Sequence, residues 1–278
     1  MIQIRHARPD EQGPAQSLWT DTFGDDGPFQ REFYRLCCAL EGPLVLVEDG
    51  ELRSMLALPG MPLILADGRR LRAGYVYALA TQPEQRGQGW AAMLLGTAAG
   101  LARNRGMDCL LTVPAQPFLF HFFAKCGFFP AFYMREVTAQ PAPAPAVPVT
   151  PMEYAALREG LLAGVAHTAY SSGQLAFQQN LCPCPGSGLY RLELAHGPGC
   201  AAVENWPGAP VVKELLCVPS DVGQGAAACA ALCGAPVRVR VPAGAADGQP
   251  FAAIRWLEGT PASIRGGAAE GWLGLAFD

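Results

Sequence analysis

The sequence predicts an α/β protein, more strictly α+β, of two domains, in which a mixed sheet is flanked by helices. Three observations lead to this prediction. A strand-forming run, 75–81, is followed by a glycine-containing turn and then by an alanine- and leucine-rich run, 91–103. Apolar runs joined by Asp-Gly pairs indicate antiparallel hairpins. The 278 residues suffice for about two domains, and a proline-rich segment divides the chain near residue 140.

Short apolar runs in the first half of the chain supply the strands of the predicted sheet. The expected strands are 1–6, 44–48, 52–58, 62–65, 70–71 and 109–113. Asp49-Gly50 separates the second strand from the third, and Asp67-Gly68 separates the fourth from the fifth. Such pairs are typical of tight hairpin turns.

The run after residue 90 has the spacing of an amphipathic helix. Its apolar residues recur at Ala91, Leu94, Leu95, Ala98, Leu101 and Ala102. This period of three to four residues predicts a helix with one buried face. Asn104-Arg105-Gly106 provides basic residues and a glycine stop.

The turn between the strand and this helix contains Gly87 and Gly89, which allow backbone amides to point the same way. The helix adds its unsatisfied first-turn N–H groups and the positive end of its dipole. The turn lacks the Lys and Ser/Thr of a nucleotide triphosphate loop. We therefore expect it to hold a pyrophosphate-bearing cofactor.

A dinucleotide site is the first alternative, because Gly87-x-Gly89-x-x-Ala92 fits the pattern G-x-G-x-x-A. That site requires an acidic residue at the end of the next strand. Here Asp108 precedes the next strand, and the strand leads into Pro114. The position of Asp108 disfavours a dinucleotide-binding oxidoreductase.

The second interpretation is a family resemblance. The stretch 81–91 resembles the acyl-coenzyme A loop of the GCN5-related N-acetyltransferases (GNAT), whose signature is Q/R-x-x-G-x-G/A. The segments 113–116 and 122–128 resemble the family's fifth strand, fourth helix and closing "FYxKxGF". Residues 18–25 look like the first-helix region of a bacterial branch. The resemblance covers about residues 1–138 and implies a mixed, mostly antiparallel sheet flanked by helices.

The resemblance also implies a set of residues that bind acetyl-coenzyme A as co-substrate. The end of the central strand would splay and bond the pantetheine, and the glycine loop would wrap the pyrophosphate. The implied cofactor-binding residues are Leu79, Ala80, Thr81, Arg86, Gly87, Gln88, Gly89, Trp90, Ala91, Gln116 and Phe123.

Acetyl transfer to an amine also needs a base, and an acid for the leaving thiolate. Many relatives place a tyrosine acid where this chain has Phe123, which has no proton to give. His121 lies two residues away and so does not share its helix face. Two catalytic candidates are left. Tyr77 shares a strand face with Leu79, and Asp278 carries the chain-end carboxylate that related tandem acetyltransferases bring into their active site.

Composition limits the partners. A net charge of −4 argues against nucleic acid, and no run approaches the length of a membrane span. Residues 1–6 lack the apolar core of a signal peptide, so we expect a cytoplasmic protein. Asp21, Asp25 and Asp26 would favour a cationic amine acceptor, unless they form only a solvated acidic loop. Self-association into a homo-oligomer is compatible with this composition.

Ten cysteines are scattered along the chain, several of them inside apolar runs. Free cysteine behaves as a small hydrophobe, so we expect core thiols. Cys182-Pro183-Cys184 is the only tight pair, and the nearest histidine, His196, is isolated. No metal site is therefore expected.

Residues 140–148 alternate proline with small residues, which predicts an extended spacer without ladder hydrogen bonds. After it, 212–232 echoes 76–95: strand, proline, Gly-Gln-Gly, helix. The run 236–242 alternates like a strand, and 251–257 and 272–277 could add two more. The predicted domains are 1–139, a linker at 140–149, and a degenerate GNAT-like copy at 150–278.

The resemblance and the glycine loop together predict an acetyl-coenzyme A-dependent N-acetyltransferase that acts on a small-molecule or peptide amine. The alternative from another class is a non-catalytic protein that binds or senses acyl-coenzyme A. Phe123 and the missing carboxylate base motivate this alternative.

Overall fold

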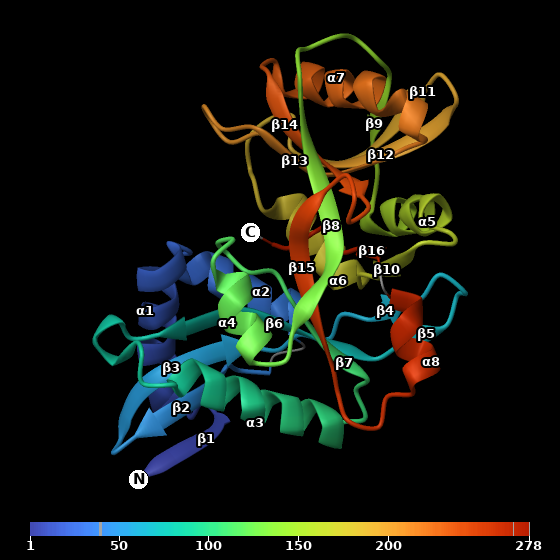
Figure 1. The fold of residues 1–278 in the computed structure, drawn as a ribbon. Coiled ribbons are helices and arrows are strands. Elements are labelled where there is room, and N and C mark those ends of the chain that lie inside the picture. The colour runs from blue at the N-terminus through green and yellow to red at the C-terminus, as the bar shows by residue number, and fades with distance from the viewer. Residues whose placement is uncertain (39–40, 269, 278) are drawn as a thin grey trace. The chain divides into compact units, whose positions relative to one another are not determined.

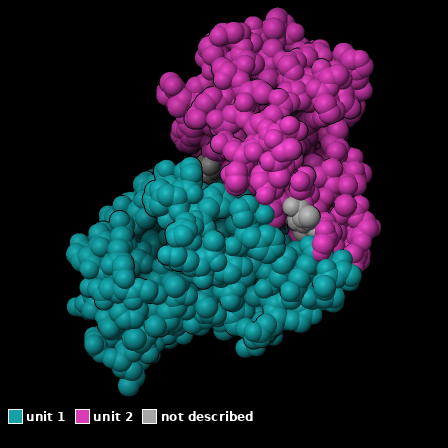
Figure 2. Space-filling view, in the orientation of Figure 1, with its two compact units in different colours: residues 1–62, 71–130, 252–265 teal, residues 63–70, 131–251, 266–278 magenta. Residues whose placement is uncertain are grey.

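The computed structural model describes residues 1–38, 41–268 and 270–277, which form two compact units (Figures 1 and 2). Unit 1 comprises residues 1–62, 71–130 and 252–265, and unit 2 comprises 63–70, 131–251 and 266–278. Each unit therefore contains a segment from the other end of the chain. The predicted boundaries, 1–139, 140–149 and 150–278, describe two sequence halves and stay a prediction.

Unit 1 is built on a sheet whose strands follow the order β1-β2-β3-β6-β7-β15. Their bounds are β1 (Ile2–His6), β2 (Leu44–Glu48), β3 (Glu51–Ala57), β6 (Ala73–Thr81), β7 (Cys109–Thr112) and β15 (Gln249–Trp256). Each neighbouring pair is antiparallel except β6 and β7, which are parallel. Five of the predicted strands therefore form in this sheet, with small shifts at their ends, at 1–6, 44–48, 52–58, 75–81 and 109–113.

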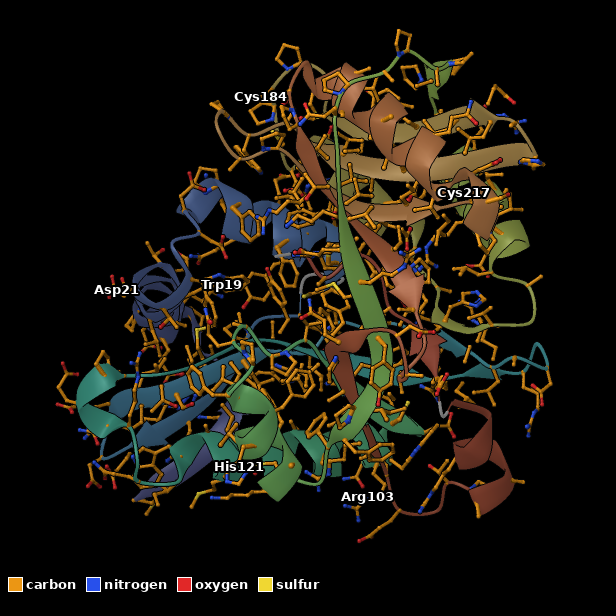
Figure 3. All side chains as sticks on the ribbon, turned by 45° about the horizontal axis from the view of Figure 1, so that its top comes forward. Trp19, Asp21, Arg103, His121, Cys184 and Cys217 are labelled. Atoms are coloured by element: carbon orange, nitrogen blue, oxygen red, sulfur yellow. The ribbon has the colours of Figure 1, made fainter. Side chains whose placement is uncertain are left out.

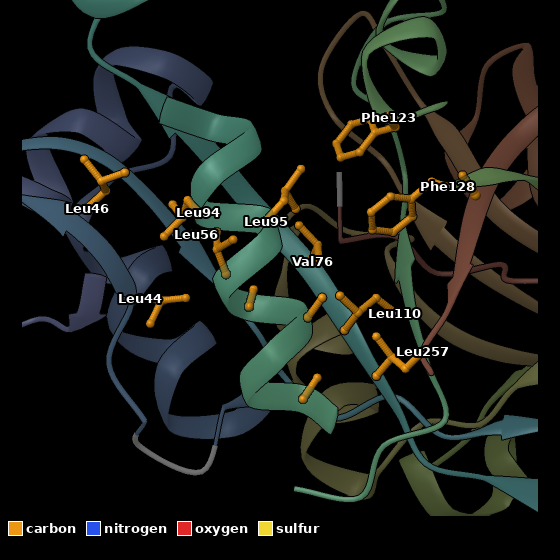
Figure 4. Close-up of a cluster of buried hydrophobic side chains, with 14 of the residues drawn as sticks. Leu44, Leu46, Leu56, Val76, Leu94, Leu95, Leu110, Phe123, Phe128 and Leu257 are labelled. Carbon is orange, nitrogen blue, oxygen red and sulfur yellow. The ribbon is translucent and has the colours of Figure 1, made fainter. Parts of the chain in front are cut away.

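Helices cover this sheet and connect its strands (Figure 1). They are α1 (Gln12–Phe23), α2 (Gly27–Cys37), α3 (Trp90–Asn104), α4 (Leu119–Lys125) and α8 (Ala262–Arg265), with 3-10 turns η1 (Pro9–Glu11) and η2 (Pro83–Gln85). The predicted apolar face of α3 is buried: Leu94 and Leu95 are 0% exposed and pack with Val76 and Leu110 (Figure 4). Burial of each such leucine stabilises the fold by about 1.5–3 kcal/mol.

Unit 2 contains a second series of paired strands with the order β9-β11-β12-β13-β14-β8. Its strands are β8 (Phe129–Ala139), β9 (Ala146–Pro148), β11 (Gly188–Leu194), β12 (Gly197–Glu204), β13 (Val211–Leu216) and β14 (Val237–Ala243). Shorter strands are β4 (Leu63–Ile64), β5 (Arg70–Leu71), β10 (Ala166–Thr168) and β16 (Gly271–Trp272). The helical segments are α5 (Pro151–Leu161), α6 (Ser172–Asn180), α7 (Val222–Cys233), η3 (Pro219–Asp221) and η4 (Gly266–Ala268).

The two main sheets have the same pairing pattern. In unit 2, as in unit 1, three antiparallel pairs are followed by one parallel pair, β13 with β14, and by a final antiparallel pair. The helix α7 connects the parallel pair of unit 2, as α3 does in unit 1. The final strands are exchanged, because β8 follows the first half in sequence and pairs in unit 2, whereas β15 pairs with β7 in unit 1.

Three sequence predictions for the second half need correction. The proline-rich segment is extended, but residues 146–148 form β9 and pair with β11 at the edge of the sheet, where proline is tolerated. Gly223 and Gly225 lie inside α7 instead of forming a turn before it. The strand predicted at 272–277 is limited to Gly271–Trp272.

The predicted fold class, a mixed and mostly antiparallel sheet flanked by helices, is confirmed. All ten cysteines are free thiols, and six of them are buried. Among the residues described, no helix is long and apolar enough to cross a membrane.

Candidate functional site

The central strand of unit 1 contains a bulge at Ala78. Tyr77 pairs with Ala57 and Ala80 pairs with Met55, so β6 has one more residue than β3 in this interval. Ala78 has φ 49°, in the left-handed region that a non-glycine residue rarely adopts. Such strain is typical of functional sites.

The bulge coincides with the end of pairing between β6 and β7. Their register runs from Ala73 with Cys109 to Val76 with Thr112, and β6 continues for five residues beyond it. The other edge of this extension stays attached to β3, since Ser54 Oγ donates to Ala80 O (2.6 Å) and lies 3.0 Å from Thr81 Oγ1. The described register with β7 therefore does not reach Leu79, Ala80 or Thr81.

A glycine loop follows this open end of β6. Gly87 and Gly89 have φ values of 80° and 87°, which glycine adopts without strain. A Cβ added at either position would meet no atom within 4 Å. Arg86 Nε donates to Thr81 O (3.3 Å), and the Gln88 amide donates to Gln85 Oε1 (3.1 Å). The backbone of this loop is therefore open to the approach of a ligand.

The first turn of α3 differs from three other helix starts. Asp26, Thr150 and Ser171 each accept a hydrogen bond from a first-turn N–H of α2, α5 and α6, respectively. At α3 the N-cap residue is Gly89, and no side chain caps the turn. The N–H groups of this turn and the helix dipole therefore suit an anion such as a pyrophosphate. Trp90, the first residue of α3, is 9% exposed, and Ala91 is half-buried.

Two further predicted cofactor residues lie at α4. Gln116 is exposed in the preceding loop, and its carbonyl accepts from the Leu119 N–H. Phe123 is buried, with its ring 5.2 Å from that of Phe122 and 5.4 Å from that of Phe128 (Figure 4). His121 is exposed on the same helix (Figure 3). The position of the relatives' acid is thus part of an apolar cluster.

Tyr77 belongs to an aromatic cluster between β6 and the first two helices. Its ring is stacked on Phe33 at 4.6 Å and lies 5.6 Å from Trp19. Tyr34 packs against Trp19 at 5.7 Å, its hydroxyl is buried, and no described residue accepts from it. Burial raises the pKa of Tyr34 far above its ordinary value. Sequence reasoning missed this cluster, although the aromatic residues spaced along α2 indicate a buried face.

Two of the three aspartates expected to attract a cationic acceptor have structural roles. Asp25 accepts from Trp19 Nε1 (2.7 Å), and burial raises the pKa of its carboxyl. Asp26 caps α2 by accepting from the Phe29 N–H (2.9 Å). Asp21 is exposed on α1 (Figure 3). Asp25 and Asp26 therefore stabilise the connection between α1 and α2.

The second catalytic candidate, Asp278, lies outside the described residues. The segment that leads to it, 271–277, is buried in unit 2. Phe277 packs against Tyr170 and Phe177, with ring centroids at 6.0 and 5.7 Å. The carbonyl of Leu273 accepts from Thr168 Oγ1 (2.7 Å). These contacts hold the segment 271–277 in place within unit 2.

Among the described residues of unit 2, no glycine loop precedes the helix that joins the parallel strands. Its helix α7 begins directly after η3, and Asp221 stands at the N-cap position. The Asp221 carboxylate accepts from the His196 N–H (2.8 Å) and lies 2.6 Å from His196 Nδ1, and these contacts lower the pKa of Asp221. A carboxylate at this helix start disfavours a phosphate.

A buried ion pair occupies unit 2 next to the bulge of β13, where the extra residue is Lys213. Arg158 Nε donates to Glu214 Oε1 (2.9 Å), and the two side chains are 1% and 0% exposed. Glu214 also accepts from the Tyr154 hydroxyl (2.8 Å) and from Trp272 Nε1 (2.5 Å). In unit 1, aromatic side chains occupy the corresponding position beside β6. In the described chain no cluster of three or more His, Cys, Asp or Glu could hold a metal ion.

Comparisons with known proteins bear on this arrangement. Residues 3–131 match the family model of the acetyltransferase (GNAT) domain. No curated protein sequence matches the chain.

The solved structures that resemble the chain share its fold at low identity. A conserved protein of unknown function from Enterococcus faecalis V583 has a TM-score of 0.70 at 14% identity, over 93% of this chain and 73% of its own. A GCN5-related N-acetyltransferase from Anabaena variabilis has 0.69 at 15%, over 92% and 73%. Eis1 from Mycobacterium abscessus has 0.64 at 15%, over 92% and 74%. The likeness in fold extends over both units.

Proposed function

We propose that this protein, whose residues 3–131 match the family model of the acetyltransferase (GNAT) domain, transfers the acetyl group of acetyl-coenzyme A to an amine. One observation carries the proposal: the end of β6 is followed, after the short turn η2, by a glycine loop and an uncapped helix. These features supply, in sequence order, backbone groups for an amide-containing chain and an anion site for a diphosphate. Acetyl-coenzyme A has both parts.

The residues proposed to hold the cofactor follow this order. Leu79, Ala80 and Thr81 bond the pantetheine through the free edge of β6. The loop and the first two helical residues, 86–91, surround the diphosphate, with Arg86 exposed beside the amides. Gln116 and Phe123 border the site from the α4 side.

The cofactor supplies an activated thioester. The chain's own contribution begins with the backbone N–H of Leu79 or Ala80, which we propose polarises the thioester carbonyl. A donor already held in position needs little reorganisation, and both N–H groups follow the bulge at Ala78, where φ is 49°.

Proton transfer is proposed to depend on water and on groups near β6. Phe123 cannot donate a proton, so the proton that the attacking amine nitrogen loses on forming the amide would pass to the leaving thiolate, directly or through water. Tyr77, half-buried at the bulge, orders this water. Asp278 stays a second proposed participant, on the resemblance to tandem acetyltransferases that bring their chain end into the active site.

The acceptor is proposed to be a small-molecule or peptide amine that enters beside the aromatic cluster. Of the three aspartates near this region, Asp25 and Asp26 accept structural hydrogen bonds, and Asp21 is exposed. The proposal therefore does not require a highly cationic acceptor. We further propose that the chain works in the cytoplasm, where its ten thiols stay reduced.

The second half is proposed to be a degenerate copy of the same fold. Its sheet repeats the pairing order of unit 1, and β13 keeps a bulge. The carboxylate of Asp221 and the buried pair of Arg158 with Glu214 disfavour a second cofactor and a second acceptor there. We propose that this copy supports the catalytic half.

A non-catalytic protein that binds acyl-coenzyme A is the second candidate, and Phe123 at the acid position favours it. Calorimetric titration with acetyl-coenzyme A and NAD(P)H, followed by thiol release across a panel of amines, separates the candidates. We expect acetyl-coenzyme A binding and turnover with at least one amine. Binding without turnover on any amine would favour the sensor, and binding of NAD(P)H alone would contradict both.

A further inference from the structure

We propose that Ser54 is a positioning residue for coenzyme A: its hydroxyl holds the end of β6 and orients the Thr81 hydroxyl, whose oxygen accepts a hydrogen bond from an amide N–H of the pantetheine arm. The inference rests on the proposed function and deepens it, because it adds side-chain recognition to the strand that would bond this arm. Ser54 lies on β3 and is fully buried, so it influences a bound ligand only through the atoms that it contacts.

The Ser54 hydroxyl stands among apolar neighbours. Leu46 pairs with Ser54 across β2, and Leu56 follows two residues later on the same face of β3; both leucines are buried. A buried hydroxyl without a partner is costly, and an apolar side chain would fill this place without that cost. The presence of a serine here is therefore explained by what its hydroxyl bonds.

The hydrogen-bond partners that the structure gives Ser54 lie at the end of β6. Ser54 pairs directly with Thr81 in the register of the two strands. Its Oγ donates to Ala80 O at 2.6 Å and lies 3.0 Å from Thr81 Oγ1. The register between β6 and β7 ends at Val76, before these residues, so contacts with β3 help to hold them in place.

The number of hydroxyl protons decides the direction of these two hydrogen bonds. A serine hydroxyl has a single proton, and a carbonyl oxygen can only accept. Ser54 therefore gives its proton to Ala80 O, and its contact with Thr81 requires Thr81 Oγ1 to donate to Ser54 Oγ. The Thr81 oxygen keeps its capacity to accept. A ligand group that bonds this oxygen must therefore be a donor.

An amide N–H is the donor that the proposed cofactor offers at this position. The carbonyls of Ala80 and Thr81 already accept hydrogen bonds, from Ser54 Oγ (2.6 Å) and Arg86 Nε (3.3 Å), respectively. The contact with Arg86 places Thr81 beside the proposed diphosphate loop, and Thr81 is half-buried, so part of its surface is accessible. The pantetheine arm carries amide N–H groups, whereas an ionised diphosphate carries acceptors.

The test follows binding of coenzyme A to the full chain by calorimetry. Ser54→Ala removes the hydroxyl that orients Thr81, and Thr81→Val removes the acceptor oxygen while keeping the side-chain shape. A neutral hydrogen bond contributes modestly, so we expect each change to weaken coenzyme A binding about three- to tenfold. Thr81→Ser, which keeps the hydroxyl, should restore most of the affinity lost in Thr81→Val. Because Ser54 acts through Thr81, the double variant should bind no more weakly than Thr81→Val alone.

A second ligand and a matched control separate this role from a general effect on the fold. 3′-Phospho-ADP has the nucleotide and the diphosphate of coenzyme A but lacks the pantetheine arm, so Ser54→Ala and Thr81→Val should not weaken its binding. Thr260 is also buried in unit 1, and its Oγ1 donates to Asp108 O (2.7 Å), before the start of β7. Thr260→Val should lose stability in urea, as Ser54→Ala does, but bind coenzyme A as wild type.

Several results would overturn the inference. One is wild-type affinity of Ser54→Ala or Thr81→Val for coenzyme A, and another is a pair of losses that add in the double variant. Equal losses toward coenzyme A and 3′-phospho-ADP would exclude the pantetheine arm as the partner. If Ser54→Ala does not fold, equal affinities of Thr81→Val and Thr81→Ser would overturn the proposal. Failure of the wild-type chain to bind coenzyme A would instead overturn the proposed function.

Discussion

Replacing Gly89 by valine provides a sharp test of the proposed cofactor loop. Gly89 has φ 87°, and an L side chain there is strained by about 1–2 kcal/mol. An added Cβ would meet no protein atom within 4 Å, so the fold has room for the side chain. The valine would occupy the space in front of the loop amides, through which a ligand must approach.

The expected loss of affinity is larger than the expected loss of stability. If the valine displaces a diphosphate from two N–H groups, at about 1.5–3 kcal/mol for each charged hydrogen bond, Kd rises by about two to four powers of ten. Titration of acetyl-coenzyme A into Gly89→Val measures this loss. Urea denaturation measures the cost in stability.

Gly50 offers a matched control in the same unit. It lies in the β2–β3 turn with φ 86°, and a Cβ there also meets no atom within 4 Å. Gly50→Val should therefore lose a similar amount of stability and bind acetyl-coenzyme A as wild type. Binding by Gly89→Val within threefold of wild type would refute the placement of the site, and an equal loss in both variants would attribute the effect to strain.

Three further outcomes are expected. Arg158→Met should lower the free energy of unfolding, measured in urea, by about 3–5 kcal/mol, because it leaves the buried Glu214 without its partner. Adding Glu214→Met should restore most of the lost free energy. Single and double variants with the same free energy of unfolding would refute this reasoning. A fragment 1–143 should aggregate in size-exclusion chromatography, since it lacks the β15 segment that pairs with β7, and a monodisperse, cooperatively folded fragment would contradict us. Arg5 holds the pKa of Glu11 at about 2, below its ordinary 4.5. Glu11→Gln should therefore lower the free energy of unfolding by about 0.2–1 kcal/mol at pH 7, and this difference from wild type should vanish as pH falls from 4.5 through 2. A difference that does not change with pH would exclude the Arg5–Glu11 pair as its cause.

Local signals made the first half of the fold predictable. The Asp49-Gly50 pair marks a hairpin because both residues adopt positive φ there. The spacing of Leu94, Leu95 and Ala98 marks the buried face of α3, and each of these residues is 0% exposed. In such places a few neighbouring residues determine the backbone.

The second Gly-Gln-Gly shows where a local pattern misleads. Gly225 is helical, and a Cβ there would lie 3.1 Å from Leu215, so this glycine permits close packing of α7 on the sheet. Gly89 permits a turn instead. The tripeptide Gly-Gln-Gly thus forms a turn at one place and part of a helix at the other, and tertiary contacts decide which.

The exchange of β8 and β15 could not be read from the sequence, because alternating apolar residues specify a strand but not its partner. The bulge at Ala78 has no sequence signal either, since alanine does not favour positive φ. The expectation of an acidic acceptor loop failed to anticipate that Trp19 and the first turn of α2 would use Asp25 and Asp26. These features depend on contacts between residues distant along the chain.

The exchanged strands impose an order on folding during synthesis. The segment that completes the sheet of unit 1, 252–256, is made after about 140 residues have followed β7. At about 5–20 residues per second, this interval lasts on the order of ten to thirty seconds. Until then the edge of β7 lacks its partner, so the sheet that holds the proposed cofactor site becomes complete only after residue 256 has been synthesised.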